Sequence, residues 1–184
     1  MDFINDIIKN CDSIVSAAKY MYACLTDMEI SIDDKLREEY SPALKSYLEA
    51  CRKMRTDLIA CFGMDNPPAE PEAPEIESSR FHIKNYKENI FDSDGNIKDE
   101  LLYSLERTKA TFSLRQMLCG RGETILNSLN CIEDIYNCNK DSLPLEKAIE
   151  VVKIVSDFQN KDTAFQSVSA AICEELLGKE IIWK

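Results

Sequence analysis

The amino-acid sequence predicts an all-α protein, a helical bundle of about six helices. Apolar residues recur at steps of three and four along the segments outside one proline-rich stretch, which is the spacing of a helix face packed against a neighbour. Only five Gly and six Pro occur in the 184 residues, and four of the prolines fall in that stretch. Long runs without helix-breaking residues favour helices over a turn-rich β fold.

The first helix is expected over residues 2–28, with an apolar seam on one face. The seam consists of Ile4, Ile8, Cys11, Val15, Ala18, Tyr22 and Leu25. Phe3, Ile7, Ile14 and Met21 widen it on one side. A stripe of this width needs more than one neighbouring helix, or a partner, to cover it.

The second helix of an N-terminal helical hairpin, residues 1–63, is expected in two pieces. Pro42 interrupts the pattern, and proline is tolerated in the first turn of a helix. We therefore expect a short helix over 32–40 and a longer one over 42–62, with Ser41 as the cap of the longer one. We expect Gly63 to end the longer helix.

Residues 64–79 read MDNPPAEPEAPEIESS and form the clearest break in the chain. Four prolines alternate with acidic residues, so neither a helix nor a core can form there. We expect an extended, solvated linker that joins the hairpin to a C-terminal bundle over residues 80–184. The alternative is a docking peptide for a proline-recognising domain.

The C-terminal part is expected to be an antiparallel bundle of short helices. Asn96 is the expected cap of a helix over 97–118, and Gly120-Arg121-Gly122 is expected to break or bend the chain before a helix over 123–137. Further helices are expected after Pro144 and from Asp162. Their expected apolar faces include Leu101, Leu105, Phe112 and Leu118 in the first helix, and Leu145, Ile149, Val152, Val155 and Phe158 in the helix after Pro144. We expect Trp183, the single Trp, to dock on the bundle.

The net charge of −11 is spread unevenly along the chain. The linker carries five acidic and no basic side chains, so the helical parts on either side of it are only mildly acidic. This distribution disfavours nucleic-acid binding, which needs a basic surface. No apolar run reaches the length of a membrane span, and the acidic, amphipathic start differs from a signal peptide, so we expect no membrane contact and a cytoplasmic location.

Metal and cofactor sites find little support in the sequence. The eight cysteines are scattered without a CxxC pair, and His82 is the only histidine, so we expect free thiols and no zinc. The DSDGN turn resembles the start of a calcium loop, but Ile97 and Tyr103 stand at loop positions six and twelve, where an EF-hand has Gly and Glu. We expect neither metal nor cofactor, and no catalytic residue.

The function expected from these observations is a non-catalytic protein–protein interaction or regulatory module acting through helical surfaces. Its partner would be another protein, or a second copy of the chain in a homo-oligomer. The candidate contact residues are Phe3, Ile7, Ile14 and Met21 on the wide stripe, and Arg121 between its two glycines. One alternative is an acidic inhibitor or decoy that blocks a basic surface of a nucleic-acid enzyme. Another is a small helical enzyme with a carboxylate-bound magnesium site at Glu146 and Glu150.

Overall fold

The computed structural model describes residues 2–26, 34–76 and 91–177. These residues form four long α-helices, α1 (Asp2–Thr26), α2 (Asp34–Phe62), α4 (Glu100–Asn139) and α5 (Leu145–Leu177). A single 3-10 turn, η2 (Lys140–Ser142), joins α4 to α5. The predicted all-α bundle is confirmed, with five helical elements in the described residues instead of about six. His82 and Trp183 lie outside the described residues.

The helix count is lower because three predicted breaks are wrong. Pro42 lies inside α2, on the exposed side of the helix, so the proline removes one helical hydrogen bond at the surface and not in the core. Gly120 and Gly122 lie inside α4 with ordinary helical dihedrals, and nothing approaches within 4 Å of the Cβ either one lacks. Asp162 lies within α5. Helix packing on both sides of each position outweighs a propensity cost of about 1 kcal/mol per glycine and about 3 kcal/mol for proline.

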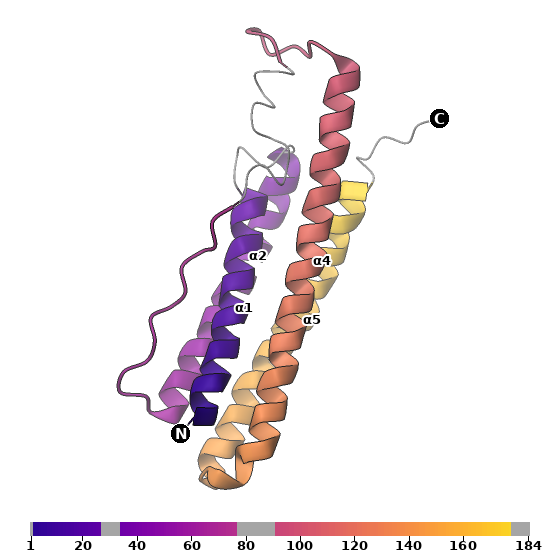
Figure 1. Cartoon of the computed structure of the whole chain (residues 1–184). Helices are drawn as coiled ribbons and strands as arrows, with labels where there is room; N and C mark the ends of the chain where they lie inside the picture. Colours follow the sequence, from indigo (N-terminus) through magenta and orange to yellow (C-terminus); the bar gives the residue numbers. More distant parts are fainter. Residues whose placement is uncertain (1, 27–33, 77–90, 178–184) are drawn as a thin grey trace.

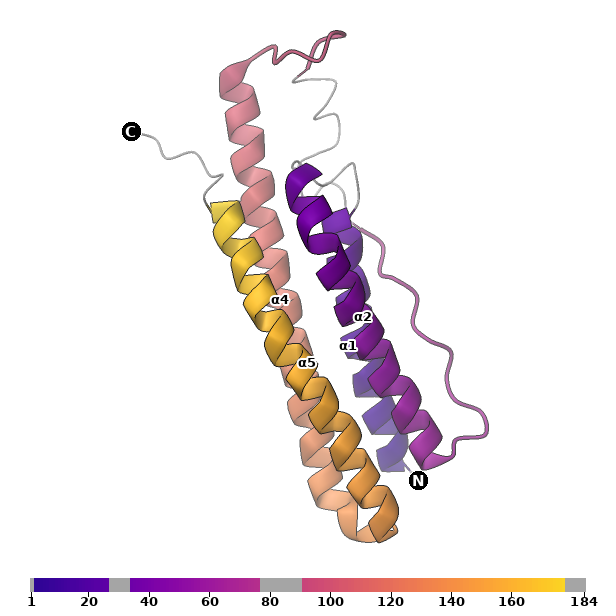
Figure 2. The same cartoon turned by 180° about the vertical axis from the view of Figure 1, so that it is seen from behind.

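The four α-helices form a ring in which each packs on two neighbours. α1 contacts α2 and α4, α2 also contacts α5, and α4 and α5 complete the ring with the least extensive contact of the four. Figures 1 and 2 show α1 and α5 running in one direction and α2 and α4 in the other. Neighbours are therefore antiparallel, and one long crossover joins the parallel helices α2 and α4. The N-terminal hairpin and the α4–α5 hairpin share one core, to which all four helices contribute.

The wide apolar stripe of α1 is covered from within the chain. Ile7, Ile14 and Met21 are fully buried, and Phe3 is partly buried against the core. The sequence left open whether a second neighbour or a partner covers the stripe, and the second neighbour is α4. These side chains therefore offer no free surface to a partner in this conformation.

A buried polar contact joins α2 to α5. The Tyr47 hydroxyl donates a hydrogen bond of 2.6 Å to Asp162 Oδ1, and Gln166 Nε2 donates to Oδ2 at 2.9 Å. The Tyr47 ring stacks on Phe165 with ring centroids 3.9 Å apart. Burial raises the pKa of the Tyr47 hydroxyl far above its usual range, so Tyr47 stays a donor to the carboxylate. Because both carboxylate oxygens accept a bond, the contact can fix the register of α2 against α5.

The turn before α4 is an Asx turn. Asp92 Oδ1 accepts hydrogen bonds of 2.9 Å from the backbone amides of Asp94 and Asn96. Gly95 has φ of 82°, a conformation that favours glycine. The predicted cap at Asn96 is wrong, because Asp99 caps α4 by accepting from the amides of Leu101 and Leu102.

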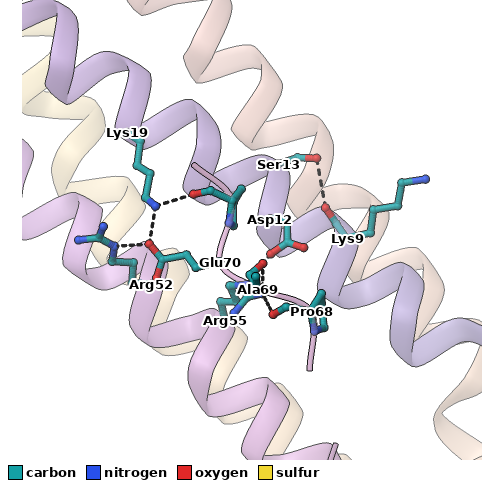
Figure 3. A network of polar contacts seen from close by, with 10 residues as sticks. Lys9, Asp12, Ser13, Lys19, Arg52, Arg55, Pro68, Ala69 and Glu70 are labelled. Atoms are coloured by element: carbon teal, nitrogen blue, oxygen red, sulfur yellow. Dashed lines mark hydrogen bonds and ion pairs between the residues drawn. The ribbon is translucent and has the colours of Figure 1, made fainter. Parts of the chain in front are cut away.

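The described part of the crossover, residues 64–76, is extended and lies along the α1–α2 pair (Figure 1). Arg55, a buried residue of α2, donates from Nε to Asp12 Oδ1 of α1 at 2.5 Å and from Nη2 to the Pro68 carbonyl at 2.7 Å. Glu70 forms one ion pair with Lys19 of α1 at 2.5 Å and another with Arg52 of α2 at 2.8 Å. Figure 3 shows these contacts joining the linker to both helices. We call this set of contacts the linker clamp.

The clamp should make stability depend on pH through Glu70. The hydrogen bond from Lys19, and the contact with Arg52, lower the pKa of Glu70. A lowered pKa means that the stabilisation is present above the unfolded pKa of Glu, about 4.3, and disappears as the pH falls through the lower folded value. The difference in unfolding free energy between the wild type and Glu70→Gln should therefore shrink towards zero in acid.

Urea denaturation between pH 3 and pH 7 measures this dependence. Since Glu70 is half-exposed, the difference at neutral pH should stay below about 1 kcal/mol. Its exposed neighbour Glu72 provides the control, because Glu72→Gln should change stability by less than about 0.5 kcal/mol. If the difference in unfolding free energy between the wild type and Glu70→Gln stays constant across the pH range, the linker clamp does not lower the pKa of Glu70.

None of the described helices combines the length with the apolar character needed to span a membrane.

Candidate interaction surface

The exposed large hydrophobic side chains of the described residues all lie on α4 and α5. They are Leu101, Leu105, Phe112 and Leu126 on α4, and Leu145, Ile149 and Val152 on α5. No large hydrophobic side chain is exposed on the described parts of α1 and α2. The asymmetry places the unburied apolar surface on one half of the bundle.

The apolar residues of α4 follow one line along the helix. They are separated by four, seven and fourteen residues, spacings that return to nearly the same face of an α-helix. Phe112 is 54% exposed, whereas Leu114 is 1% exposed. Two residues separate roughly opposite sides of a helix, so the line faces away from the core that α4 shares with α1.

The apolar residues of α5 follow a shorter line of the same kind. Leu145, Ile149 and Val152 are separated by four and three residues, and Ile149 is 61% exposed while Val151 is 1% exposed. Further along the same line stand Ser156 and Thr163, which are exposed and polar. The apolar surface of α5 is therefore confined to its first turns.

Both lines lie on the side of the α4–α5 pair that points away from α1 and α2. Each line is opposite to the buried side chains of its own helix, and those pack on α1 and α2. We call this side, with its seven apolar residues, the outer face. The corresponding side of the α1–α2 pair carries the linker, as Figures 1 and 2 show, whereas no described segment covers the outer face.

A hollow of about 480 Å³ lies where α4 turns into α5. Its lining is largely apolar and includes Leu145, Ile149 and Val152 together with Leu143 and Tyr136. The Tyr136 hydroxyl donates to the Ala148 carbonyl at 3.0 Å, which holds the ring against the start of α5. The hollow is open to solvent and adds apolar surface next to the α5 line.

Glu146 and Glu150, the carboxylates considered for magnesium, are exposed on α5. Within residues 2–26, 34–76 and 91–177, no group of three or more His, Cys, Asp or Glu side chains is arranged to hold a metal ion.

Arg121 lies on α4 at the seam with α1. Its guanidinium stacks over the Tyr20 ring, 4.2 Å from the centroid, and it is partly buried. A shallow hollow beside it is lined by Ser113, Gln116 and Met117. The structure does not bring Arg121 together with the buried Ile7, Ile14 and Met21 in one accessible surface.

The sequence did not identify the outer face, because all of its residues except Leu126 were expected on core faces of short helices. Leu145, Ile149 and Val152 form a regular stripe in the sequence, but the core uses the neighbouring stripe with Val151, Val155 and Phe158. One signal was available, since Ser156 and Thr163 interrupt the exposed stripe while the buried one continues.

No model of a known protein family matches this chain, and no curated protein and no solved structure matches it.

Proposed function

We propose that this chain is a non-catalytic protein–protein interaction module that binds an amphipathic helix of a partner protein on its outer face. The observation that carries the proposal is that, among the residues the structure describes, every exposed large hydrophobic side chain lies on α4 or α5. Exposed apolar side chains gathered on one side of a protein are candidates for an interaction site.

A helix is the occupant that this geometry fits best. The α5 line lies next to η2, whereas the α4 line ends at Leu126, thirteen residues before the end of α4. A partner helix lying along this side of the antiparallel pair would bury apolar residues spaced three and four apart on the two lines in turn. The hollow at Tyr136 and Leu145 would receive the largest of them.

Salt dependence separates this proposal from an acidic decoy. Charges of both signs flank the α5 line, among them Glu146, Lys147, Glu150 and Lys153. Binding through the outer face should therefore change little between low and high salt, whereas binding of a basic surface would weaken strongly.

Ile149→Glu is the direct test. A carboxylate in the buried centre of the interface should weaken binding at least about tenfold. The melting temperature should hardly change, because Ile149 is exposed in the free chain. Ser46→Glu, at an exposed position on α2 away from the outer face, is the control and should leave binding intact.

Two readouts distinguish the possible occupants. Light scattering of the purified chain detects a homo-oligomer, which Ile149→Glu would dissociate. Capture from host lysate at two salt concentrations detects another protein, and hydrogen exchange of the complex shows whether α4 and α5 become protected. The proposal is wrong if wild type and Ile149→Glu behave alike in both measurements.

A further inference from the structure

Two cysteines face each other across the seam between α4 and α5. The register of this antiparallel pair is fixed by a hydrogen bond from Gln159 Nε2 of α5 to Glu133 Oε1 of α4. Cys119 lies fourteen residues before Glu133, and Cys173 lies fourteen residues after Gln159. Fourteen residues are almost four turns, about 21 Å, so both steps end on the same seam at the same height.

Contact between the two thiols agrees with this register. Cys119 lies close enough to Cys173 to raise the pKa of its thiol. Burial, more than this contact, raises the pKa of Cys173. Cys119 is exposed and Cys173 is half-buried, so one thiol is open to solvent and the other stands behind it.

The other six cysteines are not arranged in this way. Cys11, Cys24, Cys51 and Cys61 are buried in the core, and burial raises the pKa of Cys11 to about 12. Thiols of this kind are inert in the folded chain. Cys131 and Cys138 are exposed on α4, seven residues apart, a spacing of about 10 Å along a helix that no disulfide can bridge.

We propose that Cys119 and Cys173 form a redox modification site, a dithiol that low-molecular-weight disulfides such as oxidised glutathione convert to an intramolecular disulfide between α4 and α5. The Cys119 thiolate attacks one sulfur of the small disulfide, which breaks its S–S bond and releases one thiol. Cys173, after losing its proton, attacks the Cys119 sulfur of the mixed disulfide and releases the second thiol. The two protein thiols are oxidised, and the small disulfide is reduced to two thiols that take up the protons.

The disulfide would act on the weakest contact of the ring. It would fasten α4 to α5 at the end of the bundle away from η2, where α4 extends past α5 (Figures 1 and 2). Cys119 also stands on the outer face, seven residues from Phe112 and seven from Leu126. The proposal does not depend on the function of that face, although a partner bound there would shield Cys119 from the oxidant.

The test is oxidation of the folded, reduced full-length chain with oxidised glutathione, followed by trypsin without reduction and mass spectrometry. The expected product is peptide 116–121 linked to peptide 162–179, with the mass of the pair reduced by two hydrogen atoms. Cys119→Ser should abolish the link and leave Cys173 as a thiol that alkylates slowly. The double substitution Cys131→Ser with Cys138→Ser should leave the link intact.

Circular dichroism of the oxidised chain should match that of the reduced chain, and dithiothreitol should restore both thiols. The proposal is overturned if Cys119 remains a glutathione mixed disulfide while Cys173 can still be alkylated. It is also overturned if Cys119 links two copies of the chain, or if the internal link forms only after urea has unfolded the helices.

Discussion

Replacing Ile14 by alanine should lower the free energy of unfolding by about 2–5 kcal/mol. Ile14 is fully buried in α1, where α2 and α4 both pack, so the deleted atoms leave a cavity that two helices border. Typical domains have only about 5–15 kcal/mol of stability, so this loss is a large fraction of the total. For a chain of this size, the melting temperature should fall by about 2–4 °C per kcal/mol.

Urea denaturation measures the effect, and Ile149→Ala is the matched control. The same atoms are removed at Ile149, but from a side chain that is 61% exposed on α5, so stability should change by no more than about 0.5 kcal/mol. Similar losses for both variants would mean that the outer face is buried in the purified chain. A negligible loss for Ile14→Ala would show that the α1 stripe is not part of the core.

Replacing Arg55 by methionine should release the linker and destabilise the chain by about 3 kcal/mol, the low end expected when one partner of a buried ion pair is removed. The guanidinium is buried, but Asp12 is partly accessible to water and can be solvated when it loses its partner, which limits the cost. The carbonyls of Pro68 and Ala69 lose their donor in the same change. Methionine retains much of the aliphatic packing of the arginine stem.

Digestion with a glutamate-specific protease reports on the linker directly. Cleavage between Glu72 and Ala73 should be faster in Arg55→Met than in the wild type, under conditions where both chains remain folded. Arg52→Met removes an exposed ion pair with Glu70 and should cost no more than about 1 kcal/mol. If both variants are cleaved at the rate of the wild type, Arg55 does not hold the linker.

The sequence predicted helices where apolar periodicity was strong, and it failed where it relied on local breakers. The stripe of α1 predicted a helix covered either by two neighbours or by a partner, and the structure shows that α4 is the second neighbour. Gly120, Gly122 and Pro42 were assigned as breaks because each is unfavourable in an isolated helix. In the folded chain, contacts on both sides of each position keep α2 and α4 continuous.

The candidate site was harder to predict than the helices. A helix with two apolar stripes does not reveal which one the core will use, since that depends on how the neighbouring helices are arranged. For α5, the answer follows from the crossover, which makes α2 its neighbour and leaves Ile149 outside. The sequence did not predict the linker clamp for a related reason. Arg55 contacts Pro68 and Ala69 only after the linker folds back.

The proline-rich crossover also limits the conformations of the unfolded chain. Its four prolines restrict the backbone to extended conformations before folding, at about 3.1 Å per residue in a polyproline II helix. Thirteen such residues, the described length, reach about 40 Å, close to the length of the 29-residue helix α2 beside which they return. A stiff connection whose length already matches that of α2 loses less conformational entropy than a flexible loop would when the helices assemble. The prolines thus favour the parallel placement of α2 and α4 before any contact between them has formed.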